Sequence, residues 1–466
     1  MNLKITEKIK SDEILSKLTK IFQNEIYLVG GSVRDYFMDI VSHDRDLIVI
    51  DEDAREYSLK AAEYLNATFV PLDEENKIYR LVMPNKIDYL DITNPIEGSL
   101  EKDLLRRDLT INSVAINLNT LEITDITGGI NDIKNKLIKH IQEENFTDDP
   151  LRLLRVFRFQ AKLGFEVDKE TANIVKKYKH LIHKPAVERI NYEILNLFGG
   201  KYTSKALICM DDIGILDEIF PFVKELKQVP PNTHHHLRLF EHCVETVKQI
   251  QDIYENSSEE IKLHLEEQNF GGNSRLAHLK LSGFMHDIGK FSTWTIEGDR
   301  HRFIKHDDVG AKIAKQILKE MHFSNKQIEY ITTMIKNHIY PSSLVSSPEL
   351  SEKVMMRYLR KMTDNSTDAI ILAKADRLSA RGPLITDEIV KNNIEGLNKL
   401  LSFCLQNIKT LEPLPILLDG NEIMSILDIK PSKELGYILD KLHEAQISGD
   451  VLTKEHALNF IKSIKI

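Results

Sequence analysis

The chain has 466 residues, of which 42% are hydrophobic and 29% are charged, and its formal net charge is −9. This length suffices for about three domains, and the composition is that of an ordinary globular protein. The negative charge excludes a chain that is basic throughout, although it allows a local basic groove for nucleic acid.

The three cysteines are scattered and form no C-x-x-C pair, which argues against a disulfide framework and favours a reducing compartment. No apolar run reaches the roughly 18 residues that a membrane helix needs, and the N-terminal residues do not resemble a signal peptide. We therefore expect a cytoplasmic protein without a membrane partner. In chain order, the first predicted element is an amphipathic helix over residues 11–23, capped by Ser11.

The next stretch, residues 26–50, is the most informative part of the chain. The apolar run Ile26–Val29 followed by Gly30-Gly31 predicts a buried strand that turns sharply into a helix beginning near Ser32. Such a turn presents backbone amides and a hydroxyl at a helix N-terminus, an arrangement that binds phosphate.

Asp44 and Asp46 precede a second apolar run, Leu47–Ile50. Because side chains alternate along a strand, both carboxylates are expected on the same face. Two neighbouring carboxylates repel each other unless a cation lies between them, and Mg²⁺ with a triphosphate is a common solution. The pattern therefore predicts metal-assisted nucleotidyl transfer.

This order of strand, glycine pair, helix, Asp-X-Asp and strand resembles the first motif of the class II tRNA nucleotidyltransferase and bacterial poly(A) polymerase family, within the polymerase-beta-like superfamily. The resemblance implies an α+β fold in which a small mixed head precedes helical segments. It implies that Asp44 and Asp46 are catalytic and hold Mg²⁺, and that Gly31, Ser32 and Arg34 contact the nucleotide.

The rest of the head is predicted as one helix and four strands, at residues 54–65 and at 68–72, 79–83, 86–92 and 114–118. Asp88 is a candidate third metal-binding carboxylate, although a solvated position at a strand edge is the alternative. The sequence between the last two strands, Arg106–Asn112, contains adjacent arginines that suit phosphate. It is similar to the family's ribonucleotide-selecting motif, with Leu109 in place of the usual Phe.

That second resemblance implies that Arg107, Asp108 and Asn112 bind the nucleotide. Further along, Asp149 opens a predicted helix on which Arg152, Arg155 and Arg158 recur every three residues and form a basic face.

The opening of this helix resembles the family's base-recognition motif, with Asp148 in place of the usual Glu. The resemblance implies that Asp149 and Arg152 hydrogen-bond the Watson–Crick edge of the incoming base, and that Arg155 and Arg158 belong to the same nucleotide site. A carboxylate suits an exocyclic amine and a guanidinium suits a ring nitrogen or carbonyl, so side chains can replace a nucleic-acid template.

The second half of the chain has an almost wholly helical pattern and contains a separate group of metal-binding residue types. His242, the pair His286-Asp287 and Asp376 each lie on or at the end of a predicted helix. Imidazole and carboxylate groups of this kind can together bind a divalent metal ion.

This arrangement resembles the HD phosphohydrolase superfamily, with all four ligands present. In that context Lys290, His306 and His338 are candidate contacts to a substrate phosphate or to a second metal ion. A histidine run at residues 234–236 is either a further approach to the metal or a surface feature.

The predicted domains are a catalytic head (1–145), a helical neck (146–228), an HD domain (229–395) and a helical tail (396–466). The tail resembles that of HD-containing tRNA nucleotidyltransferases and is either a tRNA contact or a helical cap on the HD domain. The family resemblance implies template-independent addition of CCA to the tRNA 3′ end from CTP and ATP.

The same resemblance gives the HD domain a divalent transition metal or Mg²⁺, and hydrolysis of phosphates or cyclic phosphates at RNA 3′ ends. Three related activities remain open: addition of CC only, addition of A only, and poly(A) synthesis. A different class of function, an HD phosphohydrolase whose head only senses RNA or nucleotides, is the remaining alternative. The oligomeric state is not predicted.

Overall fold

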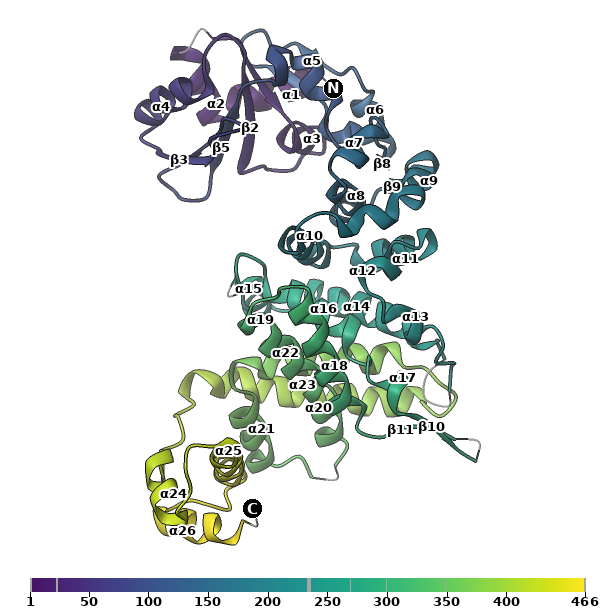
Figure 1. The fold of residues 1–466 in the computed structure, drawn as a ribbon, viewed down its shortest axis with the longest axis vertical. Coiled ribbons are helices and arrows are strands. Elements are labelled where there is room, and N and C mark those ends of the chain that lie inside the picture. Colours follow the sequence, from purple (N-terminus) through teal and green to yellow (C-terminus); the bar gives the residue numbers. More distant parts are fainter. Residues whose placement is uncertain are drawn as a thin grey trace. The chain divides into compact units, whose positions relative to one another are not determined.

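The computed structural model describes residues 2–21, 24–232, 236–268, 270–298, 300–347 and 349–464. The chain forms two compact units, Met1–Pro221 and Phe222–Ile466. The first contains a mixed sheet with helices, and the second is helical apart from a small hairpin (Figure 1). Among the described helices, none is long and apolar enough to cross a membrane.

The first unit is organised around a seven-stranded sheet with the strand order β3-β4-β5-β2-β1-β6-β7. Its strands are β1 (Ile26–Val29), β2 (Asp44–Val49), β3 (Thr68–Asp73), β4 (Ile78–Val82), β5 (Tyr89–Thr93), β6 (Ala115–Asn117) and β7 (Ile123–Thr124). A separate short pair consists of β8 (Leu137–Ile138) and β9 (Glu166–Val167). The β2 and β5 strands pair in parallel, whereas β1 pairs antiparallel with both β2 and β6.

Helices of the first unit surround this sheet and continue beyond it. They are α1 (Asn2–Ser11), α2 (Glu13–Ile21), α3 (Gly31–Phe37), α4 (Ala54–Leu65), α5 (Leu100–Leu105), α6 (Gly129–Asn135), α7 (Glu144–Asp148), α8 (Leu151–Leu163), α9 (Lys169–Tyr178), α10 (Val187–Gly199), α11 (Thr203–Ile213) and α12 (Leu216–Ile219). Short 3-10 turns are η1 (Ile96–Gly98), η2 (Thr110–Asn112) and η3 (Lys179–His183).

The strand β2 lies between β1 and β5 and buries Leu47, Ile48 and Val49 completely. Burial of this apolar end fixes the strand in the core, so that Asp44 and Asp46, the first and third residues of β2, are held at the N-terminal end of a central strand. The predicted helix over 54–65 is confirmed with the same bounds.

Two local predictions are wrong for identifiable reasons. The helix predicted over 11–23 begins at Glu13, and its first amides are bonded by Asp12 rather than Ser11, since Asp12 Oδ1 accepts from the amides of Ile14 and Leu15. The strand predicted from residue 86 begins at residue 89, because the preceding residues form a turn in which the Asn85 side chain accepts two backbone hydrogen bonds.

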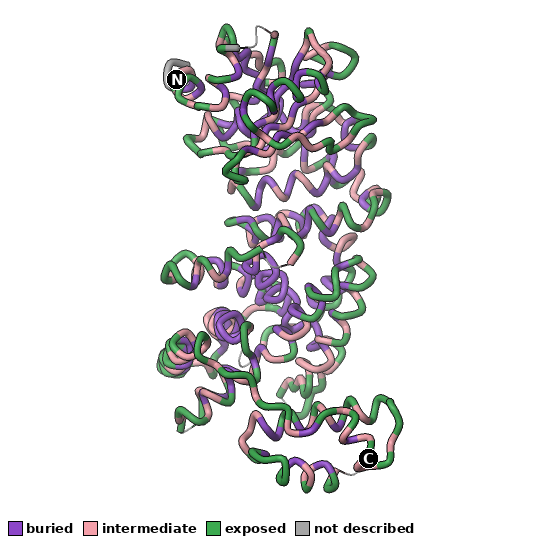
Figure 2. The backbone as a smooth tube through the Cα atoms, turned by 90° about the vertical axis from the view of Figure 1, so that its left-hand side faces the viewer, coloured by how far each residue is buried: buried purple, intermediate pink, exposed green. Residues whose placement is uncertain are grey.

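The second unit is built from helices α13 to α26 and the hairpin β10–β11. Its elements are α13 (Val223–Leu226), α14 (Leu239–Glu255), α15 (Glu259–Glu266), α16 (Arg275–Met285), α17 (Lys290–Thr293), β10 (Trp294–Glu297), β11 (Arg300–Phe303), α18 (His306–Glu320), α19 (Asn325–Asn337), α20 (Ile339–Val345), α21 (Glu352–Met362), η4 (Thr363–Asn365), α22 (Ser366–Ser379), α23 (Asp387–Asn407), η5 (Ile408–Thr410), α24 (Gly420–Leu427), α25 (Lys433–Ser448) and α26 (Lys454–Ser463). Buried residues mark the sides of the helices that face the interior (Figure 2).

The helix α16 is buried along its whole length, including its polar residues. It packs against α14, α19 and α22, and α14 also packs against α22. This packing explains why side chains that are far apart in the sequence, at the ends of α14, α16 and α22, meet at one point.

Candidate nucleotidyl-transfer site and metal centre

The first unit contains a pocket of about 730 Å³. It is lined by the β1–α3 turn, the start of β2, the segment that follows α5, and α8. Its lining includes every residue predicted from sequence to serve the nucleotide site: Gly31, Ser32, Arg34, Asp44, Asp46, Arg107, Asp108, Asn112, Asp149, Arg152, Arg155 and Arg158. Arg106, the other arginine of the pair predicted to suit phosphate, lines the same pocket, as do two basic side chains that were not predicted for it, Lys162 and Arg189. The protein is acidic overall, yet this pocket concentrates positive charge suited to a triphosphate.

The two carboxylates near the start of β2, Asp44 and Asp46, lie where burial and neighbouring negative charge favour their protonated forms. Burial raises the pKa of Asp46 to about 6; Asp44 and Asp91 add to this rise, and Arg107 opposes it. Burial and the nearby Asp91 also raise the pKa of Asp44. A group of carboxylates with raised pKa values is stabilised by a bound cation, and the all-oxygen donor set suits Mg²⁺.

The third carboxylate of this group is Asp91, not Asp88. Asp91 pairs with Asp46 in the parallel register of β2 and β5, and Arg80 holds it with two hydrogen bonds of 2.7 and 2.6 Å. Asp88 instead accepts a 2.9 Å hydrogen bond from Arg45, whose position between Asp44 and Asp46 directs its side chain to the opposite face of β2. The hypothesis that Asp88 joins the metal site is therefore wrong.

Gly30 allows Asp46 to approach the β1–α3 turn closely. Its φ angle is +75°, and a Cβ atom at this position would lie 2.6 Å from Asp46 Oδ2 and 3.1 Å from Arg107 Nη1. Only glycine meets both demands without strain, because it tolerates positive φ and leaves space for the carboxylate.

The arginines of the pocket are held by buried acids. Arg107 donates to Asp103 at 3.0 Å, Arg155 donates to Asp108 at 2.7 Å, and Arg158 Nε lies 3.0 Å from Glu193. Burial alone would raise the pKa of Asp108, but Arg155, Asn112 and Arg158 outweigh it and lower the pKa to about 2. Asp108 is therefore ionised at neutral pH and holds the side chains around it in place.

Hydrogen bonds within the protein also restrain four other predicted residues of this site: Ser32, Arg34, Asp149 and Arg152. Arg34 is buried and bonds to Asp35 and Asn112, so it orders the pocket wall. Asp149 is paired with Arg189 at 3.0 Å, and Arg152 donates to the Arg106 carbonyl at 2.6 Å. Ser32 donates its hydroxyl to the Val29 carbonyl.

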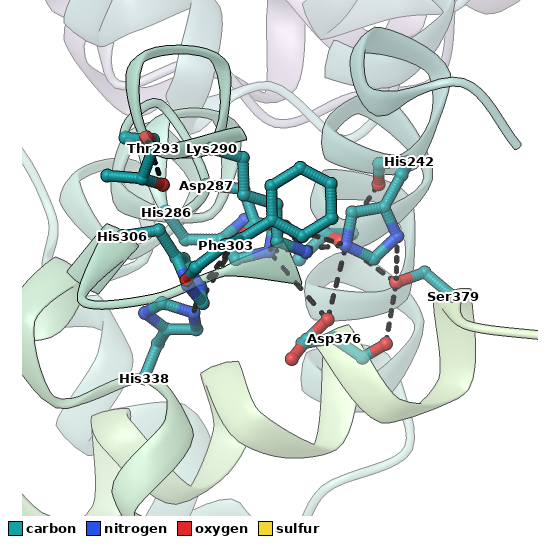
Figure 3. A network of polar contacts seen from close by, with 12 residues as sticks. His242, His286, Asp287, Lys290, Thr293, Phe303, His306, His338, Asp376 and Ser379 are labelled. Atoms are coloured by element: carbon teal, nitrogen blue, oxygen red, sulfur yellow. Dashed lines mark hydrogen bonds and ion pairs between the residues drawn. The ribbon is translucent and has the colours of Figure 1, made fainter. Parts of the chain in front are cut away.

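The second unit brings the four predicted HD ligands together (Figure 3). His242 Nε2 lies 3.2 Å from Asp376 Oδ1 and 3.5 Å from Asp287 Oδ2, while His286 Nε2 lies 3.2 Å from Asp287 Oδ2. Apart from Asp376, whose side chain is partly exposed, these side chains are buried. Among the described residues, none donates a well-directed hydrogen bond to the two buried oxygens of Asp287, which fits a carboxylate that would hold a metal ion.

His306 and His338 extend this cluster on the other side of Asp287. Their Nε2 atoms lie 3.2 and 3.5 Å from Asp287 Oδ1. Two groups able to hold a metal ion result, one of His242, His286 and Asp287 and one of Asp287, His306 and His338. Lys290, 2.6 Å from Asp287 Oδ2, supplies a positive charge at the same carboxylate.

The histidines are oriented by their second ring nitrogens. Nδ1 of His286, His306 and His338 bonds to the backbone carbonyls of Gly283, Phe303 and Ile335, respectively. His242 differs, because its Nδ1 bonds to the hydroxyl of Ser379 at 3.2 Å. Each Nε2 is thereby left for a ligand role, the usual arrangement of metal-binding histidines.

The carboxylates of this cluster stabilise a positive charge on His286. Burial opposes a charge on His286, but Asp287 and Asp376 outweigh it and raise the pKa of His286 to about 10. His234 and His235 of the predicted histidine run lie outside the described residues, so their relation to the cluster is a prediction only.

The head fold with its carboxylates beside an arginine-lined pocket defines a nucleotidyltransferase of the polymerase-beta-like type, joined to a metal-binding helical domain. Comparisons with known proteins agree. Sequence models match for the poly(A) polymerase head domain at residues 26–139, for the probable RNA- and SrmB-binding site of polymerase A at 164–227, and for the HD domain at 239–381.

Similar curated proteins span nearly the whole chain. The A-adding tRNA nucleotidyltransferase of Deinococcus radiodurans is 27% identical, over 93% of this chain and 94% of its own. The CC-adding enzyme of Thermus thermophilus is 29% identical, over 94% and 93%. The Thermotoga maritima CCA-adding enzyme, solved with tRNA, shares the fold with a TM-score of 0.55 at 21% identity, over 99% of this chain and 98% of its own.

The chain therefore belongs to the tRNA nucleotidyltransferase and poly(A) polymerase family and carries an HD domain.

Proposed function

We propose that this protein adds nucleotides to the 3′ end of tRNA without a template, using CTP and ATP, and completes the CCA sequence. The observation that carries the proposal is the pocket in which Asp44 and Asp46 lie beside a set of arginines, with Asp91 paired to Asp46 on the neighbouring strand. Relatives over nearly the full length are named A-adding, CC-adding and CCA-adding enzymes, which supports tRNA as the substrate.

In the proposed reaction, the 3′ oxygen of the tRNA attacks the α-phosphorus of the nucleotide, the bond to the β-phosphate breaks and pyrophosphate leaves. Asp44 and Asp46 would hold Mg²⁺, supported by Asp91, and Mg²⁺ supplies activation of the 3′ hydroxyl and neutralisation of phosphate charge. Arg107 and Arg155 bind and orient the phosphates.

The base and ribose are assigned to other residues of the same pocket. Asp108 and Asn112 hold the ribose, while Asp149 and Arg152 read the base edge. Because Asp149 and Arg152 are bonded to Arg189 and to the Arg106 carbonyl, these contacts are exchanged for base contacts when a nucleotide enters.

The test is incorporation of labelled nucleotide into tRNA with Mg²⁺. Asp44→Ala is expected to abolish incorporation, because it removes an oxygen ligand. Lys17→Ala, at an exposed position on α2, is expected to retain it. Normal incorporation by Asp44→Ala would contradict the assignment of this pocket.

A partial activity is the second candidate. Two relatives that cover more than nine tenths of the chain are named A-adding and CC-adding tRNA nucleotidyltransferases. Their names favour a division of labour in which this chain supplies part of the CCA sequence. Poly(A) synthesis, which uses the same nucleotidyl-transfer chemistry, is the third candidate activity.

We also propose that the HD domain removes phosphate groups from RNA 3′ ends. Water attacks the phosphorus, the bond to the ribose oxygen breaks, and a hydroxyl remains on the RNA. The imidazole ligands favour a divalent transition metal over Mg²⁺. Asp287, with Oδ2 toward His242 and His286 and Oδ1 toward His306 and His338, would help to hold the metal, which would supply activation of the attacking water.

The double variant His286→Ala, Asp287→Ala is expected to lose hydrolysis of a 3′-phosphate or 2′,3′-cyclic phosphate and to keep nucleotide addition. Loss of both activities would argue against separate sites. If hydrolysis were present and nucleotide addition absent even in the native chain, the head would be a sensor of RNA or nucleotides.

A further inference from the structure

The hairpin β10–β11 lies in the chain between two residues of the HD cluster, Asp287 and His306. Its antiparallel register pairs Trp294 with Phe303 and Ile296 with His301. Directly paired residues project from the same face of a two-stranded ribbon, so these four side chains share one face. The hairpin therefore has an aromatic and apolar face.

This face is partly open to solvent. The Trp294 and His301 rings stack with centroids 5.5 Å apart and an interplanar angle of 16°, and Trp294 Nε1 donates to His301 Nδ1 at 2.9 Å. Ile296 on the same face is 63% exposed, although isoleucine is normally among the most buried residue types. The hydrogen bond fixes the two rings as a rigid, preformed platform.

The aromatic face leads directly to the metal cluster. Phe303, at the end of β11, has its ring 5.5 Å from Lys290 Nζ and lines a small cavity together with His242 (Figure 3). The Phe303 carbonyl also bonds to His306 Nδ1 at 2.7 Å. A molecule lying on the hairpin would therefore have one end at the histidines.

The charges along the hairpin are mainly positive. Arg300 and Arg302 on β11 are exposed, as is Lys305 just beyond it. Arg302 is paired with Glu297 at 2.6 Å, whereas Arg300 has no ion pair within the described parts of the chain. Arg300 and Arg302 alternate with His301 along β11, so they project from the opposite face of the ribbon and add positive charge to the hairpin as a whole. The stacked rings match single-stranded nucleic acid, whose bases stack on aromatic side chains, and the nearby cations attract its phosphates.

We propose that the β10–β11 hairpin binds the last unpaired nucleotides of an RNA and directs its terminal phosphate to the HD cluster. The substrate of that site is then a single-stranded RNA end rather than a free mononucleotide. The catalytic part of this inference rests on the proposed phosphohydrolase function, whereas the binding of RNA to the hairpin does not.

The binding is directly observable, because Trp294 is the only tryptophan of the chain. The full-length protein is titrated with a single-stranded RNA hexamer that ends in a 3′ hydroxyl, so that no turnover occurs, and the tryptophan emission is recorded. Saturable quenching by the hexamer, and none by CMP at equal concentration, is expected. An unchanged emission, or quenching by an apolar peptide but not by RNA, would overturn the proposal.

Two variants separate a specific site from nonspecific attraction. Arg300→Gln is expected to weaken the quenching titration several-fold and to reduce its salt dependence, because the hairpin loses one positive charge that attracts phosphate. Lys248→Gln removes an equal charge from α14, where Lys248 is paired with Asp252, and is expected to leave the titration unchanged. Equal effects of both variants would contradict a site on the hairpin.

Hydrolysis gives a second, independent readout. The ratio of kcat/KM for a 3′-phosphorylated hexamer to that for 3′-CMP is expected to exceed 10 and to fall roughly 10- to 100-fold in Trp294→Ala, since a stacked base is lost. Trp294→Phe should restore most of the ratio if the hairpin is folded. A ratio unaffected by Trp294→Ala overturns the inference, whereas quenching by RNA without hydrolysis of either substrate supports the hairpin site and refutes only the phosphohydrolase function.

Discussion

Replacing Gly30 by alanine tests whether nucleotide addition needs the close approach of the Asp46 carboxylate to the backbone of the β1–α3 turn. The new Cβ would lie 2.6 Å from Asp46 Oδ2, so the carboxylate must retreat by about 0.8 Å to reach an ordinary contact distance of 3.4 Å. A misplacement of about 1 Å at reacting groups costs roughly 100-fold in rate. We therefore expect nucleotide addition by Gly30→Ala to fall about 30- to 100-fold.

Gly128→Ala is the matched control. Gly128 has a φ of +80°, close to the +75° of Gly30, and precedes helix α6 as Gly30 precedes α3, but nothing lies within 4 Å of its added Cβ. Gly128→Ala should lose about 1–2 kcal/mol of stability from its left-handed backbone (φ +80°, ψ 20°), a melting-temperature drop of a few degrees. Gly30→Ala should lose more, because φ +75° with ψ −140° is a conformation that few residues other than glycine adopt. Single-turnover addition should be slow only in Gly30→Ala; equal rates in the two variants would refute the reasoning.

Three further predictions concern the two metal sites. Asp91→Asn should weaken Mn²⁺ binding to the head by about 10-fold or more, because Asp91 lies beside Asp46. The binding is measured by electron paramagnetic resonance in a variant whose HD ligands have been replaced. Asp88→Asn should change the affinity less, because Asp88 faces Arg45. The same assay tests the pKa of Asp46, which is raised to about 6. Below that pH, protons should compete with Mn²⁺, so the metal affinity should fall about tenfold for each pH unit; above pH 6 to 7 it should be constant. A flat profile between about pH 5 and 7 would contradict the burial of this carboxylate. Ser379→Ala should lower metal affinity of the HD cluster about 10- to 100-fold by freeing the His242 ring, as measured by competition with a chelator.

Local sequence patterns were sufficient to predict the elements that carry the head site. The apolar run before Gly30 and the one after Asp46 form β1 and β2, and the helix over 54–65 has its predicted bounds. These elements are specified by neighbouring residues, through the two-residue alternation of strands and the burial of apolar runs. For the same reason the arginine face of α8 could be predicted from its spacing.

What could not be predicted depends on contacts between distant segments. Choosing Asp91 over Asp88 requires the register of β2 against β5, although the alternation of buried Leu90 and Ile92 with Asp91 was a usable signal. The position of Asp287 between two histidine pairs depends on the packing of four helices. The Asp12 cap was missed because Ser11, an equally good capping residue, directly precedes it.

The central claim is tested most directly by incubating the purified protein and Mg²⁺ with three tRNA transcripts, ending before CCA, after CC and after CCA, with CTP and ATP supplied separately and together. We expect three added nucleotides on the first transcript, one on the second and none on the third, at single-nucleotide resolution. Addition of only CC, only A, or a ladder with ATP would assign one of the related activities. No addition to any transcript would contradict the nucleotidyltransferase assignment itself.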